Sequence, residues 1–221
     1  MREFRTMSLA DQVFEKLEND IIQGVYPRGE ILTELKLVER LGVSRTPIRE
    51  ALRRLEMERL IEESGKGSVV LGITQEDLID IMNIRQHVEG VATAYATKRM
   101  TDEMRKELEH IVSLQDYYCS NGDWEHLHQL DDKFHQLLCS FSGSTVIQDV
   151  ILPLHRKSKR YRKAAVENTD RSRQMVREHR EIYEAIVKGD AQMAEKLTAE
   201  HIEKAKNNML KGLVNYGQIN S

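Results

Sequence analysis

The sequence predicts a mainly α protein, with an N-terminal winged helix-turn-helix and a C-terminal all-α antiparallel helical bundle. Three observations predict this class. Aromatic residues make up only 5% of the 221 residues and there are three prolines, which argues against a β-rich fold. Charged residues reach 31% and hydrophobic residues 40%, as amphipathic helices with solvated outer faces require. A change of pattern near Gly72 predicts one domain over residues 1–73 and an all-helical domain over residues 74–221.

The first domain is predicted to open with an amphipathic helix over residues 8–23. A turn around Pro27 and Gly29 follows it. Thr33 can then cap a short helix over residues 34–41, because its hydroxyl can accept a bond from a free backbone N–H. The apolar positions of the opening helix recur at helical spacing and are Leu9, Val13, Leu17, Ile21 and Ile22.

The stretch LGVSRTPIREALRRL, residues 41–55, predicts a turn and a second helix that together form a helix-turn-helix. Gly42 permits the sharp turn, and Ser44 can cap the next helix with its hydroxyl. Pro47 falls in the first turn, where its missing N–H costs little. The helix is predicted over about residues 46–59. Its inner face is formed by Ile48, Leu52 and Leu55.

The exposed start of this second helix is predicted to bind DNA. Arg45, Thr46 and Arg49 remain there, where a recognition helix meets base edges and phosphates. From position 40 to position 54 there are five arginines and a single acid. The whole chain has a net charge of −3, and residues 1–75 hold 12 basic and 13 acidic side chains. The prediction therefore depends on local clustering and not on bulk charge.

A glycine-bearing hairpin is predicted after the recognition helix. The segment LIEESGKGSVVLG reads as a two-stranded ribbon with a tight turn at Gly65, Lys66 and Gly67. Such a ribbon is the wing of a winged helix-turn-helix. Lys66 and Gly67 at its tip could lie in a minor groove; the alternative is an ordinary solvated hairpin.

The second domain is predicted to contain about six helices of roughly 20 residues. Connections this short make neighbouring helices antiparallel, which gives a bundle. The expected breaks lie near Met100–Thr101, Asn121–Gly122, Ser142–Ser144, Asn168–Thr169 and Gly189–Asp190.

Two charged residues fall in the apolar stripe of the first bundle helix. Arg85 and Glu89 lie one turn apart in the centre of a face that otherwise carries aliphatic side chains. A buried charge is costly unless it is paired or serves a ligand. One interpretation is a structural Arg–Glu pair. The other is that Arg85 faces a pocket and binds an anionic ligand, with Glu89 holding the guanidinium.

Four further polar residues face inward on three helices. Asp131 and His135 are four apart and share a face, and His179 and His201 lie between apolar residues of the last two helices. Three imidazoles and one carboxylate form a donor set for a first-row transition metal. The alternative is a set of hydrogen-bonded core histidines. The other histidines are expected to be superficial or incidental: 87, 110, 126, 128 and 155.

Other features of the chain are less informative. The segment HRKSKRYRK, residues 155–163, carries basic groups all round its helix, which favours a solvated helix; Arg160 is the member that could face a ligand. Cys119 and Cys139 form no metal or redox motif and are predicted to be buried thiols. No apolar run has membrane-spanning length and the N-terminus does not read as a signal peptide, so we expect a cytoplasmic protein.

These motifs together resemble the GntR family of bacterial transcription regulators, and within it the FadR-type subfamily with an all-helical FCD ligand domain. The N-terminal half carries YPRGEILTELKLVERLGVSRTPIREALRRLEMERLI, and the C-terminal half carries IRQHVEG, DDKFH and EHREIYEAIVKGD. The short ligand domain is similar to the six-helix, VanR-like branch. The resemblance implies a divalent metal held by Asp131, His135, His179 and His201. Some members have an additional DNA-contacting arginine before the recognition helix, and here that contact would pass to Lys36.

The function that we predict is a ligand-responsive, DNA-binding transcription regulator and not an enzyme. The resemblance implies a homodimer, whose two-fold symmetry would match an operator that is a short inverted repeat. The effector would be a small carboxylate, bound by Arg85 and by an open position of a divalent metal such as Zn, Ni, Mn or Fe. The alternatives are a metalloenzyme with a fused DNA-binding module, or an architectural DNA binder with a structural metal.

Overall fold

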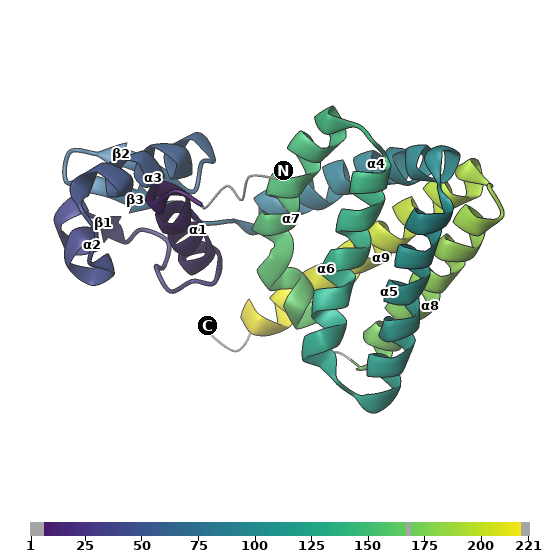
Figure 1. The fold of residues 1–221 in the computed structure, drawn as a ribbon. Helices are drawn as coiled ribbons and strands as arrows, with labels where there is room; N and C mark the ends of the chain where they lie inside the picture. The colour runs from purple at the N-terminus through teal and green to yellow at the C-terminus, as the bar shows by residue number, and fades with distance from the viewer. Residues whose placement is uncertain (1–6, 167–168, 218–221) are drawn as a thin grey trace. The chain divides into compact units, whose positions relative to one another are not determined.

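The computed structural model describes the backbone of residues 7–166 and 169–217, and the side chains of residues 7–159 and 169–211. The chain divides into two compact units, Met1–Thr74 and Gln75–Ser221. Each unit is mainly helical (Figure 1). Within the described ranges, no helix has both the length and the apolar character that crossing a bilayer requires.

The first unit combines three helices with a small sheet. Its first helix begins with a capping box, in which Ser8 accepts from the backbone N–H of Asp11 and the Asp11 carboxylate accepts from that of Ser8. Leu9, expected in the apolar stripe, is 49% exposed because it lies at the very start of the helix. In chain order the elements are α1 (Leu9–Ile22), β1 (Ile31–Leu32), α2 (Glu34–Leu41), α3 (Arg45–Met57), β2 (Ile61–Ser64) and β3 (Gly67–Val70).

The predicted helix-turn-helix is formed by α2 and α3. Thr33 caps α2, and Gly42 ends it in the left-handed region at φ 67°. Ser44 occupies the N-cap position of α3, but its hydroxyl makes no capping bond, contrary to the prediction. The reason lies in Pro47, the third residue of α3, because proline has no N–H to donate to the cap.

The wing is a three-stranded antiparallel sheet in the order β1-β3-β2, so the prediction of a two-stranded ribbon was incomplete. Ile31 of β1 lies opposite Val69 of β3, and Ser64 of β2 lies opposite Gly67. Gly67 has φ 134°, and a Cβ there would stand 2.5 Å from the carbonyl oxygen of Leu32. Glycine is therefore required where the hairpin passes the short strand β1. The core beneath the sheet and helices is built from Phe14, Leu17, Ile48, Leu55, Leu60 and Ile61.

The second unit contains six described helices, as predicted, and four of the five expected breaks fall between them. The fifth, near Asn168–Thr169, includes residue 168, which lies outside the described residues. Thr101 caps the second of them, and Gly122 ends it in the left-handed region at φ 70°. The helices are α4 (Gln75–Arg99), α5 (Asp102–Asn121), α6 (Trp124–Phe141), α7 (Thr145–Val166), α8 (Thr169–Val187) and α9 (Ala191–Gly217).

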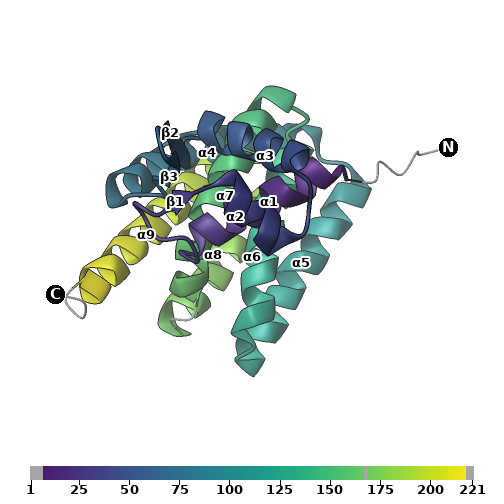
Figure 2. The same cartoon turned by 90° about the vertical axis from the view of Figure 1, so that its left-hand side faces the viewer.

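Helices α4 and α9 lie side by side in both views, although they come from opposite ends of this unit (Figures 1 and 2). Gly90 of α4 permits this close approach, because a Cβ at that position would lie 3.2 Å from the carbonyl oxygen of Glu195. The main apolar core of the bundle also draws on α5, α6 and α8, through residues such as Leu108, Val112, Phe134, Leu138, Ile182 and Ile186.

Candidate metal centre and DNA interface

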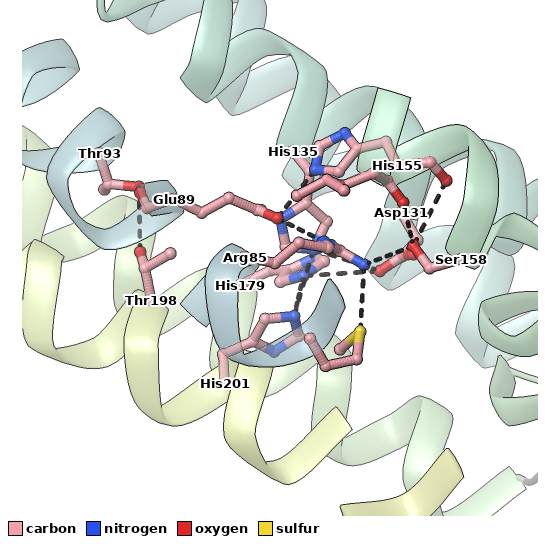
Figure 3. Close-up of polar contacts among 12 residues, drawn as sticks. Arg85, Glu89, Thr93, Asp131, His135, His155, Ser158, His179, Thr198 and His201 are labelled. Atoms are coloured by element: carbon pink, nitrogen blue, oxygen red, sulfur yellow. Dashed lines mark hydrogen bonds and ion pairs between the residues drawn. The ribbon is translucent and has the colours of Figure 1, made fainter. Parts of the chain in front are cut away.

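Three helices of the bundle bring four potential metal ligands to one point. Asp131 and His135 come from α6, His179 from α8 and His201 from α9. One donor atom from each lies within 4.8 Å of the others, and all four residues are buried. The imidazoles of His135, His179 and His201 are drawn together in Figure 3. The structure thus brings together the four residues that the sequence singled out.

The donor atoms face one another. His201 Nε2 lies 3.3 Å from His179 Nε2 and 3.3 Å from His135 Nε2. Asp131 Oδ1 lies 3.7 Å from His135 Nε2 and 3.8 Å from His179 Nε2. Two nitrogens that each bind one ion at about 2.0–2.1 Å are separated by roughly 3–3.4 Å, so these spacings fit a shared divalent ion.

Two of the imidazoles are held from behind by glutamates. His135 Nδ1 lies 2.8 Å from Glu89 Oε2, although the two groups are not aligned as a hydrogen bond. His201 Nδ1 is hydrogen-bonded to Glu178 Oε2 at 2.8 Å. A carboxylate behind a ring fixes its orientation and leaves Nε2 free to bind a metal.

The third imidazole is held by an amide. His179 Nδ1 lies 3.0 Å from Gln115 Oε1 of α5. The amide of Gln115 is itself oriented, because its Nε2 donates to the Leu130 carbonyl at 3.1 Å. Sequence analysis missed Gln115 and Glu178. A polar residue inside the α5 stripe was a usable signal for Gln115, whereas nothing local marks Glu178 as the partner of a histidine 23 positions away.

The protonation of the site also suits a metal. Burial lowers the pKa of His179 well below its ordinary value, and the neighbouring His201 and His135 lower it further. Burial lowers the pKa of His201 as well, although its hydrogen bond to Glu178 acts in the opposite direction. Both rings are therefore neutral near pH 7, which is the form of histidine that binds metals.

Glu89 joins the histidine cluster to Arg85. Its Oε1 accepts from Arg85 Nε at 2.6 Å and lies 2.8 Å from His155 Nε2 (Figure 3). Burial alone would raise the pKa of Glu89, but Arg85, His155 and His135 hold it well below its usual range. The prediction that His155 is superficial was wrong: it is 3% exposed, because α7 turns it inward towards this carboxylate. His128, also predicted to be superficial, is buried on α6.

Arg85 is completely buried and incompletely satisfied. Its Nη1 donates to Ser158 Oγ at 3.1 Å, whereas its Nη2 has no hydrogen-bond partner among the residues that the structure describes. Arg85 lines a cavity of about 30 Å³ together with Asp131, His135 and His201. A guanidinium nitrogen that has no acceptor and is out of contact with water is costly, so Nη2 favours an anion or another acceptor in this cavity. The side chain of Arg160, the other predicted effector residue, lies outside the described side chains.

The predicted DNA-reading residues lie on the surface of the first unit. Arg45, Thr46 and Arg49 are exposed at the start of α3, and Ser44 precedes them with its hydroxyl free of a capping bond. Arg49 Nε is bound to Glu34 Oε1 of α2 at 2.7 Å.

Other basic residues of this unit differ in role. Lys36 is exposed on α2, and Lys66 is exposed at the tip of the wing. Arg54 instead packs over the Phe14 ring at 3.9 Å and donates to Asp11 at 2.7 Å. The basic run therefore contains at least one structural arginine.

The sequence matches two protein families, one in each unit. Residues 9–70 match the family described as bacterial regulatory proteins, gntR family, and residues 80–204 match the FCD domain. The HTH-type transcriptional repressor RspR of Escherichia coli (strain K12) is 27% identical over 199 residues, which cover 90% of this chain and 87% of RspR. A gluconate operon transcriptional repressor of Bacillus licheniformis is 31% identical over 123 residues, 56% of this chain and 51% of that protein.

Solved structures with the same fold cover nearly the whole chain. E. coli McbR/YncC has a TM-score of 0.76 at 22% identity, covering 94% of this chain and 100% of its own, and this likeness concerns the fold alone. A putative transcriptional regulator GntR from Rhodococcus sp. RHA1 has a TM-score of 0.70 at 25% identity and covers 93% of this chain and 99% of its own. The similarity therefore extends over both units.

Proposed function

This chain belongs to the GntR family of bacterial regulators with an FCD domain and is a DNA-binding transcription regulator, and we propose that its helical unit senses a small carboxylate beside a divalent metal. The observation that carries the proposal is the Nη2 of Arg85, which has no hydrogen-bond partner in the described part of the chain and lies in a cavity lined by three of the four candidate ligands. An anion bound there would contact the guanidinium and lie next to the metal.

Asp131, His135, His179 and His201 would hold the metal. Neutral imidazoles and a carboxylate suit Zn, Ni, Mn or Fe, and the donor set does not choose among them. When bound, the ion would supply a positive charge and an open position for an oxygen donor. The three imidazole rings would be kept oriented towards the ion by Glu89, Gln115 and Glu178.

Arg85 would bind the carboxylate of the effector. Glu89 accepts from its Nε and so fixes the plane of the guanidinium, leaving Nη2 for the ligand. Lysine would replace it poorly, because a compact ammonium cannot reproduce the planar fork that matches a carboxylate.

The DNA contacts would come from α3, from the residue before it, and from the wing. Arg45, Thr46 and Arg49 would reach base edges or phosphates, and Ser44, with its hydroxyl free, would contact a phosphate. Lys36, Lys66 and Gly67 would add contacts beside them. A homodimer would place two such units on a short inverted repeat, and ligand binding would change their preferred spacing and hence the DNA affinity. The protein would act in the cytoplasm.

Isothermal titration of the metal-loaded protein with acetate, propionate and butyrate tests the proposal. Wild-type protein should bind at least one of these acids, and Arg85→Lys should lose that binding while keeping its DNA affinity. Arg105→Lys on α5 is the matched control, because Arg105 is a half-buried arginine that pairs with Asp102 and does not line the cavity, and it should bind as wild type does. Equal affinity in wild type and Arg85→Lys would reduce Arg85 to the structural half of a buried pair with Glu89.

A further inference from the structure

Arg171, in the first turn of α8, lines two neighbouring hollows of the helical unit. The inner one is the cavity of about 30 Å³ that also contains Arg85. The outer one has a volume of about 360 Å³ and lies between α8 and α9, where Asp170, Lys204 and Lys211 supply the rest of its charged lining. One buried side chain, 8% exposed, thus belongs to both hollows.

The sizes of the two hollows indicate which part of a ligand each one could hold. The inner cavity has room for a single carboxylate-sized group, whereas sites for small organic ligands occupy about 300–1,000 Å³. The outer hollow reaches that range. Because Arg171 lines both hollows, an acid whose carboxylate meets Arg85 would place its remaining atoms past Arg171 and in the outer hollow.

Among the residues whose side chains the structure describes, the outer hollow has a surplus of positive charge. Arg171 Nη1 donates to Glu178 Oε2 at 2.9 Å, and Lys204 Nζ lies 3.3 Å from Glu178 Oε1. The carboxylate of Glu178 therefore contacts both cations, and it also holds His201. Lys211 is exposed nearby, and Asp170 is the other acid in the charged lining. Three cationic side chains face two carboxylates.

We propose that this outer hollow is a second anion-binding subsite, in which Arg171, Lys204 and Lys211 bind the far acidic group of a short dicarboxylate whose near group binds at Arg85. This inference rests on the proposed carboxylate site and specifies its ligand class. The polar, partly open hollow suits a hydrated carboxylate better than an alkyl chain. The regulator would then distinguish diacids from monoacids of equal length by charge.

The test compares acids matched in carbon number by isothermal titration of the metal-loaded full-length protein. Succinate should bind wild type at least about tenfold more tightly than butyrate, as one added charge-assisted contact gives, and glutarate should exceed valerate similarly. In the double variant Lys204→Gln/Lys211→Gln the ratio of diacid to monoacid affinity should fall towards one. Both lysines are exposed, so the variant should fold, and its melting temperature verifies this.

Lys196→Gln is the matched control, because Lys196 is an exposed lysine of the same helix, pairs with Glu200 and lines neither hollow. It should keep the wild-type ratio. Equal binding of succinate and butyrate by wild type, or an unchanged ratio in the double variant, would refute the outer subsite and leave the carboxylate site at Arg85 intact. A wild-type protein that binds none of the four acids would refute both proposals.

Discussion

Glu34 of α2 accepts the Nε–H of Arg49 of α3 at 2.7 Å, so that one acidic residue holds an arginine on the face that we propose to read DNA. The contact lowers the pKa of Glu34 and raises that of Arg49, so both groups stay charged at neutral pH. Because Glu34 uses the Nε side of the guanidinium, both Nη groups remain for a bidentate contact with a guanine. Glu34 would thus orient Arg49 for reading bases.

Glu34→Ala should therefore lower the discrimination between specific and random DNA. Affinity for an operator selected with the wild-type protein should fall, because Arg49 loses its orientation. Affinity for a scrambled duplex should rise slightly, because a negative charge leaves the interface. Fluorescence anisotropy at fixed salt measures both values, with Glu39→Ala on the exposed side of α2 as the control. A parallel rise of both affinities would show that Glu34 only repels DNA.

Arg45→Ala should weaken operator binding by about 1–3 kcal/mol if Arg45 reads a base edge bidentately. Arg45 is the first residue of α3 and is exposed, as a residue that enters a major groove must be. Gel-shift titration at fixed salt provides the measurement. Arg28→Ala removes an exposed arginine from the loop after α1 and should have a much smaller effect. Unchanged affinity in Arg45→Ala would exclude it as a DNA contact.

Gly67→Ala should destabilise the wing and weaken DNA binding. The new Cβ would stand 2.5 Å from Leu32 O, and the φ of 134° is unfavourable for any L side chain. Strain of this kind costs about 1–3 kcal/mol. Gly65→Ala is the matched control in the same turn, because a Cβ there meets nothing within 4 Å. Chemical denaturation and operator titration of the two variants should differ clearly, and equal behaviour would contradict the steric argument.

The fold could be predicted largely from local signals, and the site only in part. Gly42 and Gly122 mark helix ends because each adopts a left-handed conformation there, and this requirement is visible in the sequence. The strand β1 was missed because two residues have no periodicity to detect. His155 was misjudged because the basic residues around it suggested a solvated helix, whereas its burial depends on Glu89, 66 positions away.

Loss of the amide behind His179 should weaken metal binding, and loss of two ligands should abolish it. Gln115→Ala should weaken metal binding about 10–100-fold, because His179 loses the group that orients its ring. His179→Ala combined with His201→Ala should abolish binding. Competition with a chelator measures the affinity, and elemental analysis of untagged protein measures the content. Gln192→Ala, an exposed glutamine of α9, should bind metal as wild type does. Full metal content in the double histidine variant would refute the ligand assignment.

The close approach of α9 to α4 at Gly90 also bears on the proposed metal centre, through the backbone and not through a ligand side chain. A methyl group at position 90 would push the two helices apart, since its carbon would lie 3.2 Å from Glu195 O and 3.3 Å from Glu195 Cγ. Helix α9 would relieve the contact by sliding a few tenths of an ångström and would carry His201 with it. Metal–ligand distances tolerate only about ±0.2 Å. The separation of α4 and α9, which Gly90 allows to be small, would thus affect the metal–ligand distances and hence which ion the four donors bind.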